Sequence, residues 1–307
     1  MRVGSLFSGI GLLDLGLENV GYETVWQCEH DKQASKVLAE HWPTVPNFGD
    51  ITKVDWSKVE SVDVIAGGFP CQPFSSAGLM KGASDERYLW PEFHRAIRCL
   101  RPRLVIVENV AALIRAPEWG TILGDLAEAG YDARWRVLRA SDVGAPHRRE
   151  RVFVVAYASS ARPRLQGSAS GQERTASDAL QPKTVRSSDG EDGTEGASTG
   201  SLSTTDTERQ GLQGFSKRAV EWPSESAEIN WGPYQPAIRR WGRLTRPVPS
   251  PTDERRRLSV RFVEWMMGAP QGWTDCASRT GALRGLGNGV VVQVAEEIGR
   301  WAMEVVE

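Results

Sequence analysis

Cys71 is the strongest candidate for a reactive side chain, because it stands between two prolines in GGFPCQPFS, residues 67–75. The apolar run directly before this stretch, Val62–Ala66, is typical of a buried strand. Pro70 and Pro73 fix φ on either side of the thiol, and the two glycines allow close backbone approach. Most cysteines are buried structural residues. A thiol in a rigid loop after a strand is instead a candidate nucleophile, and it needs nearby positive charge to populate the thiolate.

Charged residues that could act together with this nucleophile lie next to two apolar runs later in the sequence. Glu108 ends the run that starts at Leu104, where a carboxylate is often only a helix N-cap. Beside a thiol, it can instead protonate or hydrogen-bond a ring nitrogen. In HRRERVFVVA, residues 147–156, strand alternation puts Arg149 and Arg151 on one face. Surface charge is the ordinary explanation, and a clamp for a phosphate or a base is the functional one.

The N-terminal stretch LFSGIGLLDLG, residues 6–16, places two glycines directly after an apolar run. A plain tight turn would explain them, but Glu29 follows at a spacing that suits hydrogen bonds from ribose hydroxyls. Asp50, in GDI, could bind an adenine amino group. Because the turn lacks the lysine and the Ser/Thr of a P-loop, a nucleoside without phosphates fits as well as a dinucleotide.

Short apolar runs alternate with helix-like segments over residues 1–158, and these elements must position the reactive side chains. The expected strands are 3–7, 24–28, 62–66, 104–107, 133–138 and 152–157. The expected helices are 12–19, 31–41, 89–100 and 122–129. This alternation predicts an α/β fold with a doubly wound, mostly parallel sheet. Ligands of such sheets bind outside the carboxyl ends of the strands.

The sequence changes character after Ala158. Residues 159–214 are rich in Ser, Thr, Gly and acidic residues, and we expect them to be a flexible insert. Residues 236–257 contain seven arginines and two acidic residues, which gives this segment a local charge of +5. A solvated charge run is the usual reason, but tryptophans and prolines lie among these arginines and favour a nucleic-acid surface over about 221–257. Helical patterning returns over 258–267 and 290–305.

Composition limits the setting in which the chain works. It has 307 residues, 40% of them hydrophobic and 25% charged, with a formal net charge of -2. It lacks an apolar run of the roughly 18 residues that a membrane span needs, and its start does not look like a signal peptide. Its four cysteines are far apart, which argues against disulfides or a zinc site and for a reducing compartment. We therefore expect a cytoplasmic protein with no membrane partner and no metal.

In their order along the chain, these motifs resemble those of the cytosine-5 DNA methyltransferases, which use S-adenosylmethionine. The match rests on FSGIG (7–11), Glu29, GDI (49–51), GGFPCQPFS, ENV (108–110), HRRER (147–151), FVEWMMGAPQGW (262–273) and GNGV (287–290). The resemblance implies a Rossmann-like class I methyltransferase fold with a second, smaller, loop-rich target-recognition domain. Residues 1–158, completed by 281–307, would form the catalytic domain. Residues 159–280 would form the target-recognition region, supported by 258–280.

The resemblance also implies roles for individual residues. Cys71 would be the nucleophile at cytosine C6, Glu108 would contact N3 and the exocyclic amine, and Arg149 and Arg151 would lie near the base. The residues implied to bind S-adenosylmethionine are Phe7, Ser8, Gly9, Ile10, Gly11, Glu29, His30, Asp50, Ile51, Pro70, Asn288 and Gly289. The residues expected to contact DNA are Gln72, Ser75, Arg239, Arg240 and Arg243.

Three positions depart from the usual pattern of the family. His147 stands where glutamine is usual, Leu12 where a second glycine is common, and Gly289 where serine is common. None of them removes a group that performs chemistry, so the expected partners remain duplex DNA and S-adenosylmethionine. The resemblance also implies a nucleoid-associated protein of bacterial or phage type, with a companion restriction endonuclease as a genomic rather than a physical partner. A monomer is the default. Transfer-RNA methylation, or a non-catalytic DNA-binding relative, are the alternatives.

Overall fold

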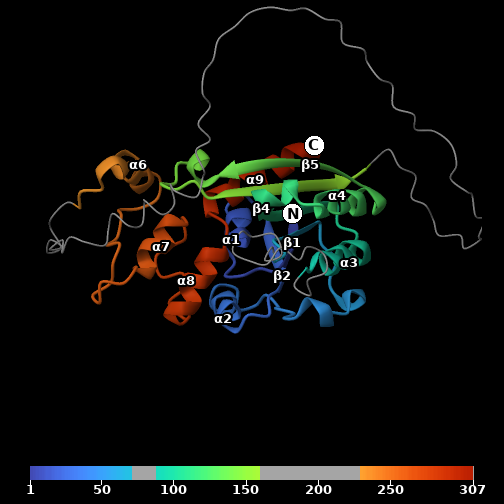
Figure 1. Ribbon diagram of the computed structural model, residues 1–307. Helices are drawn as coiled ribbons and strands as arrows, with labels where there is room; N and C mark the ends of the chain where they lie inside the picture. The colour runs from blue at the N-terminus through green and yellow to red at the C-terminus, as the bar shows by residue number, and fades with distance from the viewer. Residues whose placement is uncertain (71–87, 160–228, 307) are drawn as a thin grey trace, which may run out of the picture. The chain divides into compact units, whose positions relative to one another are not determined.

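The computed structural model describes residues 1–70, 88–159 and 229–306, and in these residues a six-stranded sheet forms the centre (Figure 1). The strands are β1 (Arg2–Leu6), β2 (Glu23–Cys28), β3 (Val64–Gly67), β4 (Leu104–Val110), β5 (Tyr131–Arg139) and β6 (Glu150–Ala158). Their order is β2-β1-β3-β4-β6-β5. The first four are mutually parallel, whereas β6 runs antiparallel to both of its neighbours. The predicted α/β class and mostly parallel sheet are confirmed, and the reversed strand β6 is the feature that the sequence pattern did not indicate.

Two apolar layers cover the sheet, one on each face. Along β4, Leu104 and Ile106 point into one cluster with α1 and α9, whereas Val105 and Val107 point into another with α3 and α4. This alternation follows from the strand period of two. A strand that is buried on both faces reads as a continuous apolar run, which explains why the run before Glu108 is apolar throughout.

Six of the described helices lie close to predicted ranges, whereas two, over residues 235–244 and 279–288, had no predicted counterpart. They are α1 (Leu12–Glu18), α2 (Lys32–His41), α3 (Trp90–Leu100), α4 (Glu118–Glu128), α6 (Gln235–Leu244), α7 (Val260–Met266), α8 (Arg279–Asn288) and α9 (Val292–Val306). Short 3-10 helices are η1 (Ile51–Lys53), η2 (Trp56–Lys58), η5 (Ala111–Arg115), η6 (Ala140–Val143) and η7 (Gly232–Tyr234). Side-chain caps set several starts: Asp31 caps α2, Ser259 caps α7 and Ser278 caps α8. The helix predicted from residue 122 begins a turn earlier, at Glu118.

The C-terminal helix α9 packs directly on α1, although the two are far apart in sequence. Gly16 and Gly299 allow this approach, because a Cβ at Gly16 would lie 2.4 Å from Ala295 Cβ, and one at Gly299 would lie 2.7 Å from Val20 Cγ2. The end of the chain thereby covers the same sheet face as its beginning.

The described residues up to 159 and from 231 onward form one compact unit. Residues 160–228, which contain nearly all of the predicted flexible insert, lie outside the described residues. Within the described residues, no helix combines the length and the apolar character needed to cross a bilayer.

Asp14 is a fully buried carboxyl group on α1, beneath the turn that follows β1. It accepts hydrogen bonds from Ser5 Oγ at 2.6 Å and from Gln27 Nε2 at 3.1 Å. Burial nevertheless raises the pKa of Asp14 from 3.8 to about 7. The folded state thus holds a proton that the unfolded state releases, so the stabilisation from neutral Asp14 is complete below about pH 4 and is lost as pH rises through about 7.

Replacing Asp14 with asparagine should therefore change how stability depends on pH. Asparagine has nearly the same shape as aspartic acid and stays neutral at every pH. The melting temperature of the variant minus that of the unmodified chain should therefore be larger at pH 8 than at pH 5 by roughly 4 °C or more. Scanning calorimetry at four pH values measures this difference. Asp132→Asn, at an exposed position on β5, is the control. A constant offset between the Asp14→Asn and unmodified curves would contradict the titration.

Candidate functional site

A cleft of about 440 Å³ opens at the carboxyl ends of the parallel strands. Its walls come from the segments that follow β1, β2 and β3, from the end of β4, and from α8 with the residues after it. The predicted site residues that line it are Phe7, Ser8, Gly9, Ile10, Glu29, His30, Pro70, Glu108, Arg151, Asn288 and Gly289. The fold therefore brings segments from near the start and near the end of the chain into one cavity. The candidate donor-binding residues and the candidate catalytic pair Glu108 and Arg151 line this same cavity.

The turn that follows β1 is a tight left-handed structure. Phe7, Gly9 and Gly11 have φ values of 52°, 57° and 75°. A Cβ at Gly11 would lie 2.4 Å from the ring of Trp42, so only glycine fits there. A Cβ at Gly9 would meet nothing within 4 Å, and Gly9 lines the cleft. The turn thus exposes its backbone to the cavity, and a ligand can approach it closely.

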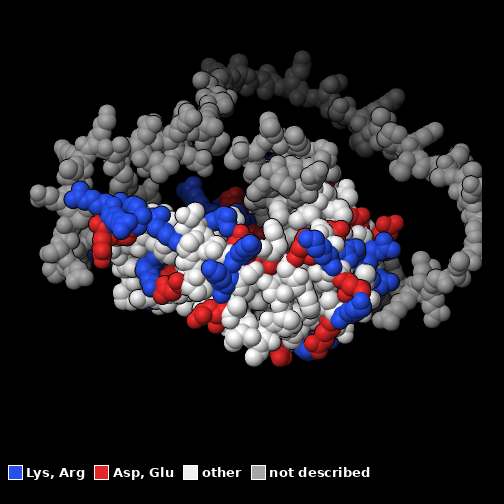
Figure 2. All heavy atoms as spheres, turned by 90° about the horizontal axis from the view of Figure 1, so that it is seen from below, with Lys and Arg blue, Asp and Glu red and all other residues white. Residues whose placement is uncertain are grey.

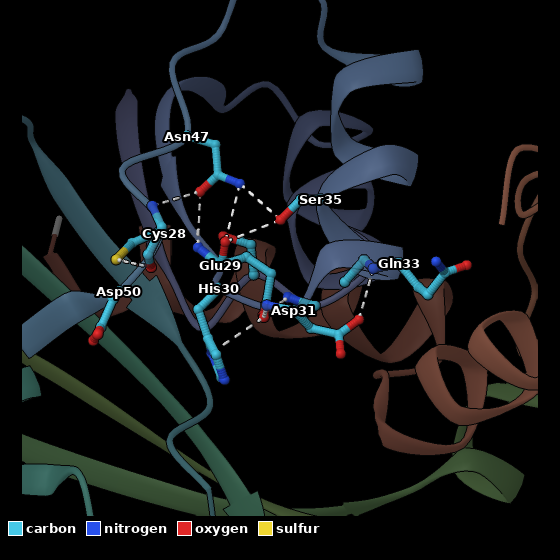
Figure 3. A network of polar contacts seen from close by, with 12 residues as sticks. Cys28, Glu29, His30, Asp31, Gln33, Ser35, Asn47 and Asp50 are labelled. Atoms are coloured by element: carbon cyan, nitrogen blue, oxygen red, sulfur yellow. Dashed lines mark hydrogen bonds and ion pairs between the residues drawn. The ribbon is translucent and has the colours of Figure 1, made fainter.

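Glu29 holds this turn from the position directly after β2, and Figure 3 shows it beside Asn47 and Asp31. Its Oε2 accepts the Gly9 N–H at 2.9 Å, and its Oε1 accepts the Asp31 N–H at 2.7 Å. Each carboxylate oxygen keeps a second lone pair, and the side chain, 11% exposed, reaches the cleft. Glu29 can therefore accept hydrogen bonds from two neighbouring hydroxyl groups, such as those of a ribose.

Asn47 links Glu29 to the segment that carries Asp50 (Figure 3). Its Oδ1 accepts the N–H groups of Glu29 at 2.9 Å and Gly49 at 3.1 Å. Its Nδ2 donates to the carbonyl oxygen of Glu29 at 3.1 Å and to Ser35 Oγ at 3.2 Å. The amide therefore fixes the distance between two segments that are 18 residues apart in sequence.

Four of the predicted catalytic and donor-binding residues that the structure describes are not among those that line the cleft: Gly11, Asp50, Ile51 and Arg149. Gly11 lies beneath the turn against Trp42, and Ile51 is buried with its carbonyl oxygen accepting a hydrogen bond from Arg95 Nη2 at 2.8 Å. Asp50 is partly exposed, and hydrogen bonds from Thr52 lower the pKa of its carboxyl to about 2. Asp50 is therefore an ionised acceptor at neutral pH.

The candidate acid at the other side of the cleft is Glu108. It lies near the end of β4, and its side chain is only 12% exposed. Its Oε1 lies 2.8 Å from Arg151 Nε on the neighbouring strand β6. Burial raises the pKa of Glu108, although the charges of Arg151 and Arg149 partly offset this effect. The site thus contains a carboxyl group that can hold a proton at a higher pH than an exposed glutamate.

Two neighbours connect Glu108 and its strand to the segment that leads into Cys71. A Cβ at Gly68 would lie 2.4 Å from Glu108 Oε2, so glycine at this position leaves room for the carboxyl group. Asn109 is 3% exposed, and its Nδ2 donates to the carbonyl oxygen of Phe69 at 3.1 Å. The first described range ends at Pro70, the residue after Phe69, and Pro70 lines the cleft. Cys71, Gln72 and Ser75 lie outside the described residues.

The three departures from the usual pattern each have a defined contact. A Cβ at Gly289 would lie 2.9 Å from Leu12 Cδ1, so leucine at one position and glycine at the other complement each other in size. Arg149 Nη2 donates to the carbonyl oxygen of Gly289 at 2.8 Å. A ring nitrogen of His147, Nε2, lies 3.0 Å from the carbonyl oxygen of Met266 and joins the start of β6 to α7. All three therefore act in packing around the cleft.

Arg239, Arg240 and Arg243 lie on α6 with their side chains exposed. The opposite side of this helix is anchored by Trp241, which is fully buried and donates Nε1 to the carbonyl oxygen of Trp265 at 2.7 Å. Figure 2, which views the molecule from below, shows Lys and Arg side chains together with some Asp and Glu at its left end, and α6, at the top of Figure 1, does not face this view. The helix thus presents its arginines outward from a rigid support.

Several residues in or beside the cleft were not identified from the sequence. They are Ser5, Asp31, Asn47, Gly68, Phe69, Asn109, Gly281, Arg284 and Gly285. Gly68 lies in the motif GGFPCQPFS and Asn109 in the motif ENV. Their positions next to Pro70 and Glu108 are the sequence signal that could have identified them. Asn47, Gly281 and Arg284 act through contacts that no local pattern reveals.

The sequence profile of the family described as C-5 cytosine-specific DNA methylase matches residues 1–303 of this chain. Among curated proteins, the type II methyltransferase M.Bsp6I of Bacillus sp. (strain RFL6) is 37% identical over 164 residues, which cover 51% of this chain and 52% of that protein. The type II methyltransferase M.HgiCII of Herpetosiphon aurantiacus is 38% identical over 161 residues, which cover 50% and 36%. The chain thus spans about half the length, or less, of the curated relatives it matches.

Solved structures share the fold over the whole chain. A putative DNA modification methyltransferase encoded within a prophage of E. coli superposes with a TM-score of 0.59 at 20% identity, covering 100% of this chain and 99% of that one. The methyltransferase EhMeth of Entamoeba histolytica superposes with a TM-score of 0.60 at 15% identity, with coverage of 100% and 99%. These likenesses show the fold, a class I methyltransferase fold, and the profile match over nearly the full length shows the family. The chain belongs to the C-5 cytosine-specific DNA methylase family.

Proposed function

We propose that this protein transfers a methyl group from S-adenosylmethionine to carbon 5 of a cytosine in a specific duplex DNA sequence. One observation carries the proposal: in a chain of this family, the turn bound by Glu29 and the buried Glu108–Arg151 pair line the same cleft, at the point where the loop of Cys71 begins. One side of this cleft, the first pocket, therefore suits a nucleoside, and the other side, the second pocket, suits an electron-poor ring.

The residues at the first pocket fit S-adenosylmethionine. Glu29 offers free lone pairs to ribose hydroxyls, and the open space at Gly9 admits a ligand against the backbone. Asn288 and Gly289 complete the wall from the C-terminal side. When bound, the donor supplies an electrophilic methyl group. The cleft needs no phosphate-binding side chain for such a ligand, because the donor carries no phosphate.

At the second pocket, the chain's own residues activate the cytosine. The ring is electron-poor, so C5 is a weak nucleophile until the Cys71 thiolate forms a bond to C6. This addition interrupts the aromatic system and moves electron density onto C5, while Glu108 places a proton at N3 to stabilise the developing charge. Arg151 holds Glu108 in position. After C5 has taken the methyl group, it loses its proton to a base, the sulfur–C6 bond breaks to release the thiolate, and N3 returns its proton to Glu108.

A thiol cannot reach C6 inside stacked duplex DNA, so the base must leave the helix at a cost of a few kcal/mol. Contacts to the phosphate backbone offset such a cost. We propose that residues 159–280 read the target, with the exposed arginines of α6 on the phosphates, and that residues 1–158 with 281–307 perform the chemistry. Because the named relatives are type II methyltransferases, a role beside a companion restriction endonuclease is part of the proposal. A nuclease gene next to this one would support that role.

Sequencing of DNA treated with the purified protein tests the function and finds the target at the same time. Mixed-sequence duplex DNA is incubated with S-adenosylmethionine and read for 5-methylcytosine. We expect the modification at one recurring sequence, and none when the donor is omitted. A parallel incubation with transfer RNA separates the two nucleic acids: methylated RNA with unmodified DNA would contradict the proposal.

Charge reversal on α6 should weaken the binding of duplex DNA. In the variant Arg239→Glu/Arg240→Glu, we expect at least a tenfold higher Kd at roughly 0.1 M salt, because two phosphate contacts are lost and repulsion is added. The slope of log Kd against log salt should flatten by roughly two. Fluorescence anisotropy with a labelled duplex measures both.

The control for this variant changes the same amount of charge elsewhere. Arg98→Glu/Arg300→Glu alters exposed arginines on α3 and α9, away from α6. Its Kd and salt slope should stay within about twofold of the unmodified chain. Equal weakening by both variants would mean that only the net charge matters, and α6 would lose its assignment.

A further inference from the structure

Trp273 reaches the donor-binding turn from a segment more than 250 residues away in sequence. Its Nε1 donates a hydrogen bond of 2.8 Å to the carbonyl oxygen of Ile10, and the indole is only 6% exposed. Ile10 stands between Gly9 and Gly11, the two glycines with positive φ, and lines the cleft. The contact therefore acts on the backbone of the turn itself.

The turn has few other side-chain supports on its second half. Glu29 binds the N–H of Gly9, whereas the N–H of Gly11 is bound by the carbonyl oxygen of Ser8 at 2.9 Å within the turn. Gly11 is also the N-cap of α1 and has no side chain to cap it. In the part of the chain that the structure describes, the side-chain hydrogen bond to the backbone of Ile10 and Gly11 thus comes from Trp273.

Trp273 is itself held firmly in place. Its ring stacks on His41 with centroids 3.5 Å apart and planes at 5°, and His41 Nε2 lies 2.8 Å from its carbonyl oxygen. It also contacts Trp42 edge-on at 5.6 Å, and Trp42 is the ring that lies against Gly11. The turn consequently rests on an aromatic support formed by His41, Trp42 and Trp273.

One buried carboxylate fixes the chain on both sides of Trp273. Glu264, 0% exposed on α7, accepts the N–H of Gly272 at 3.0 Å. It also accepts the N–H of Thr274 at 2.9 Å and the Thr274 hydroxyl at 2.7 Å. Burying this charge is expensive unless its oxygens are satisfied. They are satisfied by the two neighbours of Trp273 and by Arg261, whose Nη1 donates to Oε2 at 3.2 Å. Glu264 therefore sets where the indole points.

We infer that Trp273 is a positioning residue for the methyl donor: through its hydrogen bond to Ile10, the segment from Glu264 to Thr274 sets the affinity of the donor-binding turn. The inference rests on the proposed function for the identity of the donor. We assigned residues 258–280 to the support of target recognition. The inference adds a second role for part of this segment, on the donor side of the cleft.

The variant Trp273→Phe tests the hydrogen bond, because phenylalanine keeps an aromatic ring and removes only the N–H and part of the volume. We expect the Kd for S-adenosylhomocysteine, measured by calorimetry on the full chain without DNA, to rise roughly three- to tenfold. The KM for S-adenosylmethionine should rise similarly, with kcat at saturating donor within about twofold.

Trp26→Phe is a matched control. Trp26 is 1% exposed and donates Nε1 to the carbonyl oxygen of Glu60 at 3.0 Å, but it does not line the cleft. This variant loses the same kind of bond from the same kind of site, and its Kd for S-adenosylhomocysteine should be unchanged. Equal weakening by both tryptophan variants would mean a general loss of stability and would overturn the inference.

Hydrogen exchange keeps the inference separate from the proposed function. Amides of residues 8–13 should exchange faster in Trp273→Phe than in Trp26→Phe, whether or not a donor binds. Unchanged exchange there would overturn the positioning role. If the unmodified chain bound no S-adenosylhomocysteine, the proposed function would fail, while the exchange rates would still decide the role of Trp273. Glu264→Gln provides a second variant, with a smaller effect in the same direction.

Discussion

Replacing Glu108 with glutamine is expected to lower the rate of methyl transfer to DNA by about 100-fold or more at saturating donor and DNA, the usual contribution of a general acid. Glutamine fills the same space between Gly68 and Arg151 and can still donate a hydrogen bond, but it cannot deliver a proton to N3. Single-turnover assays with a radiolabelled methyl group measure the rate. The Kd for S-adenosylhomocysteine should stay within about twofold.

The pH profile distinguishes this role from a structural one. Burial raises the pKa of Glu108, so its protonated, active form is present at low pH and is lost as pH rises through that pKa. The thiolate of Cys71 has the opposite dependence, so the unmodified rate should pass through a maximum. Glu108→Gln should lose the fall on the alkaline side.

Glu150→Gln is the control for the Glu108 variant. It changes an exposed carboxylate next to Arg151 that pairs with Arg139 instead. We expect its rate and its pH profile to match those of the unmodified chain. A Glu108→Gln protein that kept more than a third of the rate, or that kept the alkaline fall, would remove Glu108 from the chemistry.

Replacing Cys71 with serine is expected to reduce methyl transfer by at least roughly 10³-fold, because a neutral hydroxyl is a far poorer nucleophile toward C6 than a thiolate. Donor binding should persist, since the variant leaves Glu29 and the turn after β1 unchanged. Filter binding of labelled DNA and calorimetry with S-adenosylhomocysteine separate these effects.

A trapping experiment makes the covalent step visible. With 5-fluorocytosine at the target, fluorine cannot leave C5 as a proton does, so the sulfur–C6 bond should persist. The unmodified chain should then migrate with the oligonucleotide in a denaturing gel, and Cys71→Ser should not. Cys99→Ser, at an exposed position on α3, should still be trapped. A trapped Cys71→Ser protein would falsify the assignment of the nucleophile.

The sequence alone was enough for the elements and for much of the list of chemical groups. Strand and helix periodicities are local properties, and they located the sheet strands and most helices to within a few residues. Glu29 and Glu108 could be identified because each ends an apolar run, and the carboxyl ends of parallel strands meet at one edge. The resemblance to a family then supplied roles for these groups.

Only the tertiary structure decided which groups touch. The pairing of Glu108 with Arg151, the clamp of Asn47 on Glu29 and the bond from Trp273 to Ile10 each join residues that are distant in sequence. The antiparallel direction of β6 and the complementary sizes of Leu12 and Gly289 also depend on contacts between distant parts of the sequence. The reason is physical: periodicity depends on neighbours along one chain segment, whereas these contacts depend on how separately formed segments pack in three dimensions.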